Sequence, residues 1–236
     1  MAFSLIDKTT NNNDLANYGA TRVTTSLPFT GCSEAIKVVR ASSQYLSAGG
    51  SSSLDITSVL TIESWVRLGA APSVIQWVVG KDHDTGGRSF AFGLDNLGKI
   101  FVQIAGVNPS VSGTTALTEG TWRHIAFTYE DSTDAISYYL DGSPDGTATN
   151  TGALAASTAL LNIGRRSYTT SELYFDGDIT EVRIWNTLRT PSEISSNYNI
   201  SLLGNENGLV AYYPFSRSYN YKNNLRPRVF APGYAR

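Results

Sequence analysis

The sequence has few residues that could cross-link the chain or bind a transition metal. Its 236 residues include one cysteine, Cys32, and two histidines, His83 and His124. A single cysteine cannot form an intramolecular disulfide, and two separated histidines without cysteine partners do not make a zinc motif. The cysteine count therefore carries no information on the redox compartment.

Long hydrophobic runs are also absent. No apolar stretch approaches the roughly 18 residues of a membrane-spanning helix, and residues 1–13 lack the basic start and apolar core of a signal peptide. We therefore expect no membrane insertion and a protein made in the cytoplasm without a signal peptide.

Charged side chains are sparse. They make up 16% of the chain, below the roughly 25% of an average soluble domain, and the net charge is -2. Such a body does not offer the basic face that nucleic acid requires, so we expect no nucleic-acid partner. The C-terminus differs, because no acidic residue follows Glu206 while five basic residues do, namely Arg217, Lys222, Arg226, Arg228 and Arg236.

Short strand-like segments dominate the middle of the chain. Runs of Val, Ile, Tyr, Phe and Trp alternate with turn residues, as in an antiparallel β-sandwich. In residues 60–68 the even-numbered side chains fall on one face of a strand and the odd-numbered ones on the other. Further strands are predicted at residues 75–79, 89–94, 99–105, 121–129, 136–140, 160–163, 179–185 and 208–215.

The composition divides the chain into three parts. Residues 1–41 are polar and irregular, and they predict an extended N-terminal arm with one strand near its end. Residues 42–216 predict a sandwich with one short helix near 191–199, where Thr190 and Glu193 suit a capping box. Residues 217–236 predict a basic C-terminal arm.

Five segments occur in an order that resembles a known family. They are LTIESWV at 60–66, GTWRHIAFTY at 120–129, YYLDG at 138–142, LNIG at 161–164 and FDGDITEVRIW at 175–185. This series is similar to the laminin G-like and pentraxin-like jelly-roll domains of the concanavalin A-like lectin/glucanase superfamily. The resemblance covers about residues 42–216 and implies an all-β jelly roll of two antiparallel sheets. It also implies binding at loops on one rim or on a concave face.

The carboxylates argue against catalysis. For the glucanases, the resemblance implies a strand with three carboxylates at alternating positions, so that an acid and a nucleophile face the sugar together. Glu63 and Glu181 each lack a carboxylate two residues further along. We therefore expect a protein that is not an enzyme.

Two loops contain carboxylates that suit calcium, which takes about six to eight oxygen ligands. Asp82 and Asp84 stand beside glycines, and Asp178 precedes the last motif strand. The alternative is that Asp82 and Asp84 are solvated in a hairpin and that Asp178 caps a turn. Thr180 stands where related domains commonly have an acidic residue, which weakens the calcium hypothesis. We expect no required cofactor and keep calcium as the alternative.

Aromatic and basic side chains indicate a candidate ligand site. Exposed rings stack on sugar faces, and Trp77, Tyr168 and Tyr174 are the candidates. Arg165 and Arg166 follow the LNIG segment, on a rim where a polar ligand or a neighbouring subunit can bind. The alternatives are a core position for Trp77 and a solvated loop around the two arginines.

Two functions fit these features. The first is a structural or display protein of a large assembly, such as a bacteriophage virion, whose arms dock onto other subunits while the jelly roll binds host glycans. It predicts a virion location and a homo-oligomer or assembly-bound chain. The second is a carbohydrate-binding or adhesion module, outside the cell or at its surface. The docking residues of the first are Arg217, Lys222, Arg226, Arg228, Phe230 and Tyr234.

Overall fold

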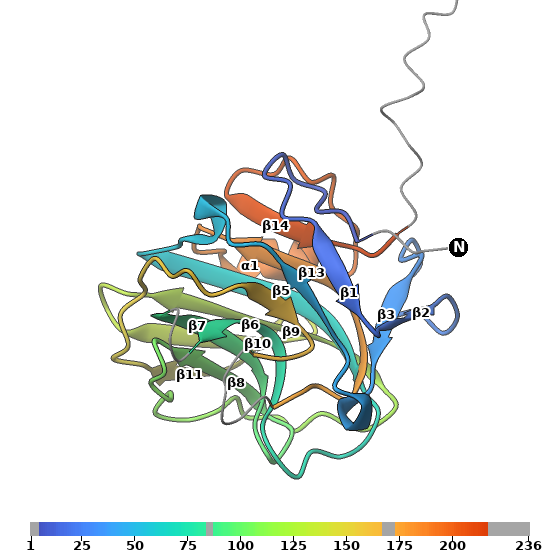
Figure 1. Ribbon diagram of the computed structural model, residues 1–236. Coiled ribbons are helices and arrows are strands. Elements are labelled where there is room, and N and C mark those ends of the chain that lie inside the picture. Colours follow the sequence, from blue (N-terminus) through green and yellow to red (C-terminus); the bar gives the residue numbers. More distant parts are fainter. Residues whose placement is uncertain (1–4, 84–86, 167–172, 217–236) are drawn as a thin grey trace, which may run out of the picture.

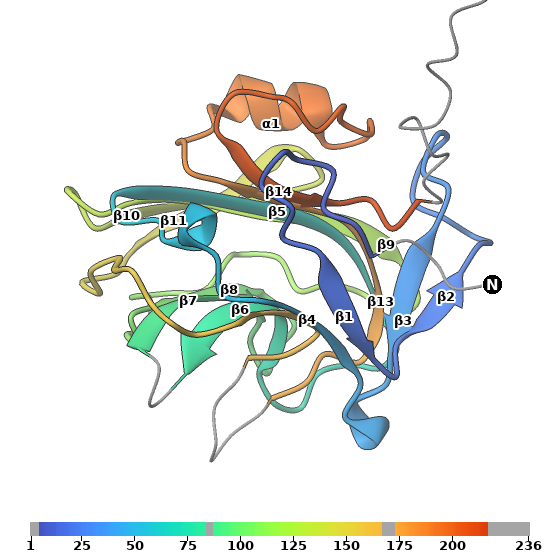
Figure 2. The same ribbon diagram turned by 45° about the horizontal axis from the view of Figure 1, so that its top comes forward.

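The computed structural model describes residues 5–83, 87–166 and 173–216. Their strands form two antiparallel sheets that pack face to face (Figures 1 and 2). The jelly-roll sandwich expected from the sequence is confirmed. The six-stranded sheet has the order β1 (Leu15–Tyr18), β4 (Tyr45–Ala48), β12 (Leu161–Ile163), β6 (Gln76–His83), β7 (Gly87–Leu94) and β8 (Ile100–Ile104).

The second sheet is eight-stranded, and β13 (Gly177–Trp185) pairs with three other strands. On one edge of β13, β3 (Ala35–Val38) pairs with residues 177–179 and β14 (Leu209–Tyr213) pairs with residues 182–185. Between the two, a bulge shifts the pairing with β5 (Val59–Leu68) on the other edge, and Glu181 has a φ of 53°. The order is β11 (Ser143–Thr149), β10 (Ala135–Leu140), β9 (Trp122–Glu130), β5 (Val59–Leu68), β13 (Gly177–Trp185), β3 (Ala35–Val38) and β2 (Thr21–Val23), with β14 (Leu209–Tyr213) paired to β13.

The core lies between the sheets because successive side chains of a strand point to opposite faces. In β5, Ile62 and Val66 are buried in the core while Trp65 lies on the other face, as the sequence predicted. Phe92 of β7 and Phe127 of β9 meet across the core, with their ring centroids 5.0 Å apart. These contacts hold the sheets together.

One helix, α1 (Pro191–Asn197), covers the outer face of the eight-stranded sheet (Figure 2). Its predicted capping box is confirmed, because the backbone N–H of Glu193 donates to Thr190 Oγ1 and the Glu193 carboxylate accepts from the Thr190 N–H. Ile194 packs on Ala126 and Tyr139 of the sheet. Within the described residues, no helix is long and apolar enough to cross a membrane. The described residues also form two 3-10 turns, η1 (Arg40–Ser42) and η2 (Ser52–Leu54).

The described part of the predicted N-terminal arm, residues 5–41, belongs to the sandwich. It forms three strands instead of one, with β1 at the edge of the six-stranded sheet and β2 and β3 in the other sheet. Leu15, Ile36 and Val38 are part of the core. Where the sequence predicted an extended arm with one strand near its end, the described residues thus have three strands, each paired within the sandwich. Each strand has four residues or fewer, which is too short to show a periodic pattern.

Two other strands escape the sequence pattern for similar reasons. β4 has four residues, and β11 has the polar sequence SPDGTAT. In both cases neighbouring strands supply the hydrogen bonds that define the element.

Asp7 ties the N-terminal segment to β14. Its buried carboxylate accepts hydrogen bonds from the backbone N–H groups of Thr9 (3.0 Å), Asn13 (3.0 Å) and Tyr212 (2.9 Å). The side chains of Thr9 and Asn13 add two more, at 2.8 and 3.1 Å. One side chain thus fixes the loop that leads into β1.

Replacing Asp7 with alanine is expected to destabilise the fold. Each buried donor left without an acceptor costs about 1–3 kcal/mol, so we expect a loss of at least about 3 kcal/mol for Asp7→Ala. Urea unfolding of the variant and the parent chain measures it. The control is Glu119→Gln, an exposed carboxylate that should change stability by less than about 0.5 kcal/mol. A similar small change for Asp7→Ala would contradict the anchoring role.

Candidate functional site

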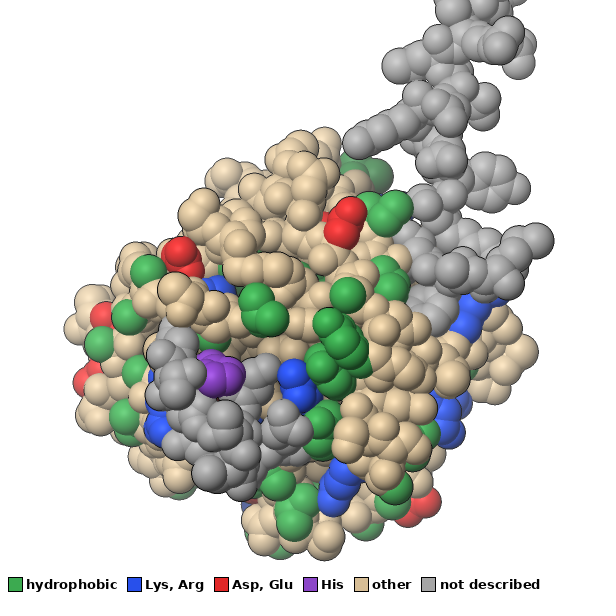
Figure 3. Space-filling model, in the orientation of Figure 1, with side chains coloured by type: hydrophobic (Ala, Val, Ile, Leu, Met, Phe, Trp, Pro, Cys, Tyr) green, Lys and Arg blue, Asp and Glu red, His purple; other side chains and the backbone are tan. Residues whose placement is uncertain are grey.

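The outer face of the six-stranded sheet carries the candidate site. Side chains on this face alternate with those of the core, and they include Tyr18 of β1, Tyr45 of β4, Asn162 of β12 and Phe101 of β8. Figure 3 shows this side of the molecule, where hydrophobic and basic side chains lie next to one another. No helix of the described chain covers it (Figure 2).

Tyr18, Tyr45, Arg165 and Tyr174 form a group that we call the tyrosine–arginine stack. Tyr18 and Tyr45 are register partners in β1 and β4, and their rings stack with centroids 4.4 Å apart and planes 2° from parallel. The Arg165 guanidinium lies 3.6 Å from the Tyr45 ring centroid. Arg165 Nη1 also lies 3.4 Å from the Tyr174 hydroxyl. The Arg165 guanidinium therefore contacts both Tyr45 and Tyr174.

The stack remains accessible at its outer end. Tyr18 is 50% exposed, and the other three members are partly exposed. One ring face of Tyr18 rests on Tyr45, so the exposed part of the ring faces away from the stack. A flat aromatic surface beside hydrogen-bonding groups is a common platform for ligands with an apolar face and polar edges.

Arg166 lies beside the stack and packs onto the sheet. Its guanidinium is 5.1 Å from the Trp77 ring, its Nη1 donates to Gln103 Oε1 at 2.6 Å, and the Asp82 carboxylate is 3.5 Å away. Gly80 permits this approach, because a Cβ there would lie 2.9 Å from the Arg166 Cα. Because Gly80 has no side chain, the segment that carries both arginines can lie directly against the sheet.

The structure brings together three of the predicted ligand-binding residues, Arg165, Arg166 and Tyr174. It corrects a fourth, because Trp77 is 0% exposed and packs with Ala91 and Phe101 under Arg166. Trp77 is therefore a core residue that offers no ring face to a sugar. Tyr168 lies outside the described residues.

Sequence reasoning missed Tyr18 and Tyr45. Neither lies in a segment with a strand pattern, since β1 and β4 have four residues each. The tyrosines become neighbours only through the register of the two strands. The sequence signal for them is one aromatic residue in each of two short segments. This signal indicates a site only once the pairing of the two segments is known.

The predicted calcium ligands are not gathered in one place. Asp82 is on β6 of the six-stranded sheet, near Arg166, and Asp178 is on β13 of the other sheet, where its carboxylate is 2.7 Å from Arg67 Nη2. Asp84 lies outside the described residues. The described chain has no group of three or more His, Cys, Asp or Glu side chains that could hold a metal. Calcium binding stays a prediction, with Asp82 and Asp178 unable to share one ion.

The predicted assembly contacts cannot be placed. All six lie outside the described residues, namely Arg217, Lys222, Arg226, Arg228, Phe230 and Tyr234.

α1 and residues 198–203 after it form a layer on the eight-stranded sheet, which we call the helix layer. Glu63 and Glu181 belong to a buried ionic cluster under this layer. Arg183 Nη2 is 3.2 Å from Glu181, Arg183 Nη1 is 3.6 Å from Glu63, and both glutamates are 1% exposed. Trp185 Nε1 donates to Glu63 at 2.8 Å, and the Tyr212 hydroxyl donates to Glu181 at 2.6 Å. Both carboxylates thus neutralise and orient protein groups, and no substrate can reach them.

Burial shifts the protonation of this cluster. Desolvation lowers the pKa of the fully buried His124, although the Glu63 carboxylate 3.4 Å away opposes the shift. Desolvation alone would raise the pKa of Glu63, but His124 and Arg183 hold it below its usual value. At neutral pH the cluster therefore contains a neutral imidazole beside an ionised carboxylate.

Comparison with known proteins identifies the family. The family model described as concanavalin A-like lectin/glucanases superfamily matches residues 40–195. The chain belongs to this superfamily. A search of curated protein sequences found no match. The solved structures described below are distant in sequence, so they indicate the architecture of a superfamily member and nothing finer.

Three solved structures illustrate the likeness. Domain 4 of AbnA, a GH43 extracellular arabinanase from Geobacillus stearothermophilus solved with arabinotriose, is 14% identical, with a TM-score of 0.58 over 84% of this chain and 98% of that one. The CBM40 of the Ruminococcus gnavus IT-sialidase, bound to alpha2,3 sialyllactose, is 11% identical, with a TM-score of 0.52 over 70% and 96%. A Bacteroides ovatus protein provisionally described as carbohydrate binding is 21% identical, with a TM-score of 0.55 over 66% of this chain and 45% of that one. The chain thus spans less than half the length of the Bacteroides protein.

The buried His124 predicts a loss of stability in mild acid. Below about pH 6.5 the unfolded chain takes up a proton on this histidine while the folded chain, with its lowered pKa, does not. Stability should then fall with decreasing pH, by at most about 1.4 kcal/mol per pH unit, until the folded pKa is reached.

Chemical unfolding of the parent chain and of His124→Gln between about pH 7 and pH 5 tests this, in a window chosen to lie above the ordinary pKa of glutamate. The variant should lose most of the slope. His83→Gln, which changes the other histidine, serves as the control and should keep the slope because His124 is retained. An unchanged slope in His124→Gln would show that other groups cause the pH dependence.

Proposed function

We propose that this chain is a carbohydrate-binding module that holds its ligand on the outer face of the six-stranded sheet. The observation that carries the proposal is the tyrosine–arginine stack. It presents a half-exposed tyrosine ring, a guanidinium 3.6 Å from a second ring, and a phenol hydroxyl on the outer face of the six-stranded sheet. We call this face, which no helix of the described residues covers, the uncovered face. Sugars match this combination, since they have an apolar C–H face and hydroxyls at their edges.

The contacts that position Arg165 favour binding. Arg165 is held by the Tyr45 ring and by Asn162 Oδ1, 3.4 Å from its Nε, as well as by Tyr174. A side chain that is ordered before the ligand arrives loses less conformational entropy on binding. The stack can therefore bind a ligand although the contact area is small.

The comparisons support the same class of ligand. Two of the distant fold relatives were solved with arabinotriose and with alpha2,3 sialyllactose. At 14% and 11% identity, they support the architecture of a sugar-binding jelly roll. The choice of ligand for this chain has to be argued from its own residues.

The placement of the described carboxylates supports binding without catalysis. Glycoside hydrolysis requires two carboxyl groups that flank the scissile bond. Glu63 and Glu181 are sealed beneath the helix layer, and Asp82 is buried beside Arg166. None of the three can flank a sugar on the uncovered face, so we assign the chain a binding role.

Tyr18→Ala is expected to weaken glycan binding while leaving the fold intact. The loss of one exposed stacking ring, worth about 1 kcal/mol, should weaken binding by about fivefold. The full chain is first applied to a glycan array, and the best-bound glycan is then titrated into the parent and the variant. Tyr45→Ala should have a larger effect, because it also removes the ring that positions Arg165.

Leu203→Ala provides the control, since Leu203 is 84% exposed but lies next to the helix layer and not on the uncovered face. It should leave the affinity unchanged. If the array shows no bound glycan, carbohydrate binding is contradicted. If both tyrosine variants bind the glycan as well as the parent chain does, the glycan binds at another site.

Display on a bacteriophage virion stays a prediction, as do the virion location and the homo-oligomer. Its C-terminal docking residues lie outside the described chain, and residues 5–41 are built into the sandwich. Assembled particles mixed with the full chain, and with a chain lacking residues 217–236, would test it. The hypothesis expects truncation to abolish particle binding, and equal binding of both chains would reject docking through that segment.

A further inference from the structure

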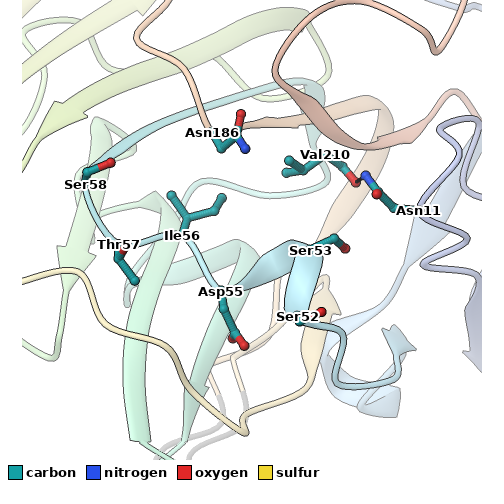
Figure 4. Close-up of a pocket in the computed structure, with 9 residues that line it drawn as sticks. All are labelled: Asn11, Ser52, Ser53, Asp55, Ile56, Thr57, Ser58, Asn186 and Val210. Atoms are coloured by element: carbon teal, nitrogen blue, oxygen red, sulfur yellow. Dashed lines mark hydrogen bonds between the residues drawn. The ribbon is translucent and has the colours of Figure 1, made fainter.

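A polar groove runs along one end of the sandwich, away from the tyrosine–arginine stack. It consists of two adjoining hollows of about 340 and 330 Å³, which share Ser52 and Asp55. Its walls come from the segment between η2 and β5, from the residue after β13 and from the N-terminal segment (Figure 4). We name this feature the serine groove. A hollow of this size suits one or two sugar rings.

Hydroxyl and amide side chains dominate the wall, and several of them are unused by the protein. Ser52, Thr57, Ser58 and Asn186 are exposed, and their side chains make no hydrogen bond with the described residues. They supply both donors and acceptors within one hollow (Figure 4). The floor is apolar only at the buried residues Ile56 and Val210.

Asp55 sets the charge of the groove. Its Oδ1 accepts from the buried Lys81 Nζ at 3.0 Å, and Lys81 also donates to the Ser157 carbonyl. Asp55 Oδ2 accepts no hydrogen bond from the described residues, and the Asp55 side chain is 31% exposed. Among the described lining residues no other charged side chain is present. The groove therefore disfavours anions and offers a fixed carboxylate oxygen to hydroxyl donors.

We propose that the serine groove is a second binding site, selective for uncharged sugars. Unused hydroxyl and amide groups match the donors and acceptors of a sugar, and the small apolar floor matches its C–H face. The carboxylate of Asp55 accepts from a sugar hydroxyl while Lys81 keeps it in place. The proposal rests on residues that share nothing with the tyrosine–arginine stack, so either site can fail without the other.

The test uses the full isotope-labelled chain and a panel of uncharged sugars consisting of glucose, galactose, mannose, arabinose, maltose and lactose. NMR titration at millimolar concentrations should shift the backbone amides of residues 52–58 and Asn186 with at least one sugar. The double variant Ser58→Ala/Asn186→Ala removes two ligand hydrogen bonds and should weaken that sugar by about tenfold. Ser58→Tyr, which fills the groove, should abolish the shifts.

Two controls separate this site from the other. Ser196→Ala removes an exposed hydroxyl on α1 and should change nothing. Tyr18→Ala should leave the groove titration intact while weakening glycan binding on the uncovered face. Shifts confined to the neighbourhood of Tyr18 and Tyr45 would overturn the groove proposal and leave the proposed function standing.

Other outcomes are equally decisive. A panel that shifts no amide in the groove would show that it holds water only. Shifts near Asp55 with calcium chloride but not with the sugars would make it a cation site and overturn the assignment. Binding that persists in Ser58→Tyr would also overturn it, because the sugar would then sit elsewhere.

Discussion

The buried guanidinium of Arg183 is the interaction on which the outer layer of the fold depends. A cation removed from water is stable only if charges and hydrogen bonds replace the lost solvation. Arg183 finds them in Glu63 on the neighbouring strand, in Glu181 at the bulge of its own strand, and in the carbonyls of Asn197 and Ile200. Because these partners lie on two strands and on the segment at the end of α1, the cluster fastens the helix layer to the eight-stranded sheet.

That attachment makes the two outer faces of the sandwich different. α1 and the segment after it cover part of the outer face of the eight-stranded sheet, whereas no helix of the described residues covers the outer face of the six-stranded sheet, where we place the proposed binding site (Figure 2). The strand at its edge, β1, comes from the N-terminal segment and contributes Tyr18. Asp7 holds the loop before this strand, so the anchor of the N-terminus also positions a residue of the binding face.

The two candidate sites differ in chemistry as well as in place. The tyrosine–arginine stack combines aromatic rings with a positive charge, whereas the serine groove combines hydroxyls with a negative one. As proposed, the two sites would let one module contact two different parts of a branched glycan, or two separate chains. Such contacts add avidity when their spacing matches the ligand.

Local patterns in the sequence determined the fold class, most strands of residues 42–216, and the helix with its cap, because alternation and capping depend on residues close together in the chain. They also pointed to Arg165, Arg166 and Tyr174. Only the tertiary structure decided that Trp77 is buried and that Tyr18 stacks on Tyr45. The physical reason is that strand register and burial are set by hydrogen bonds and packing between segments far apart in sequence, which no local pattern contains.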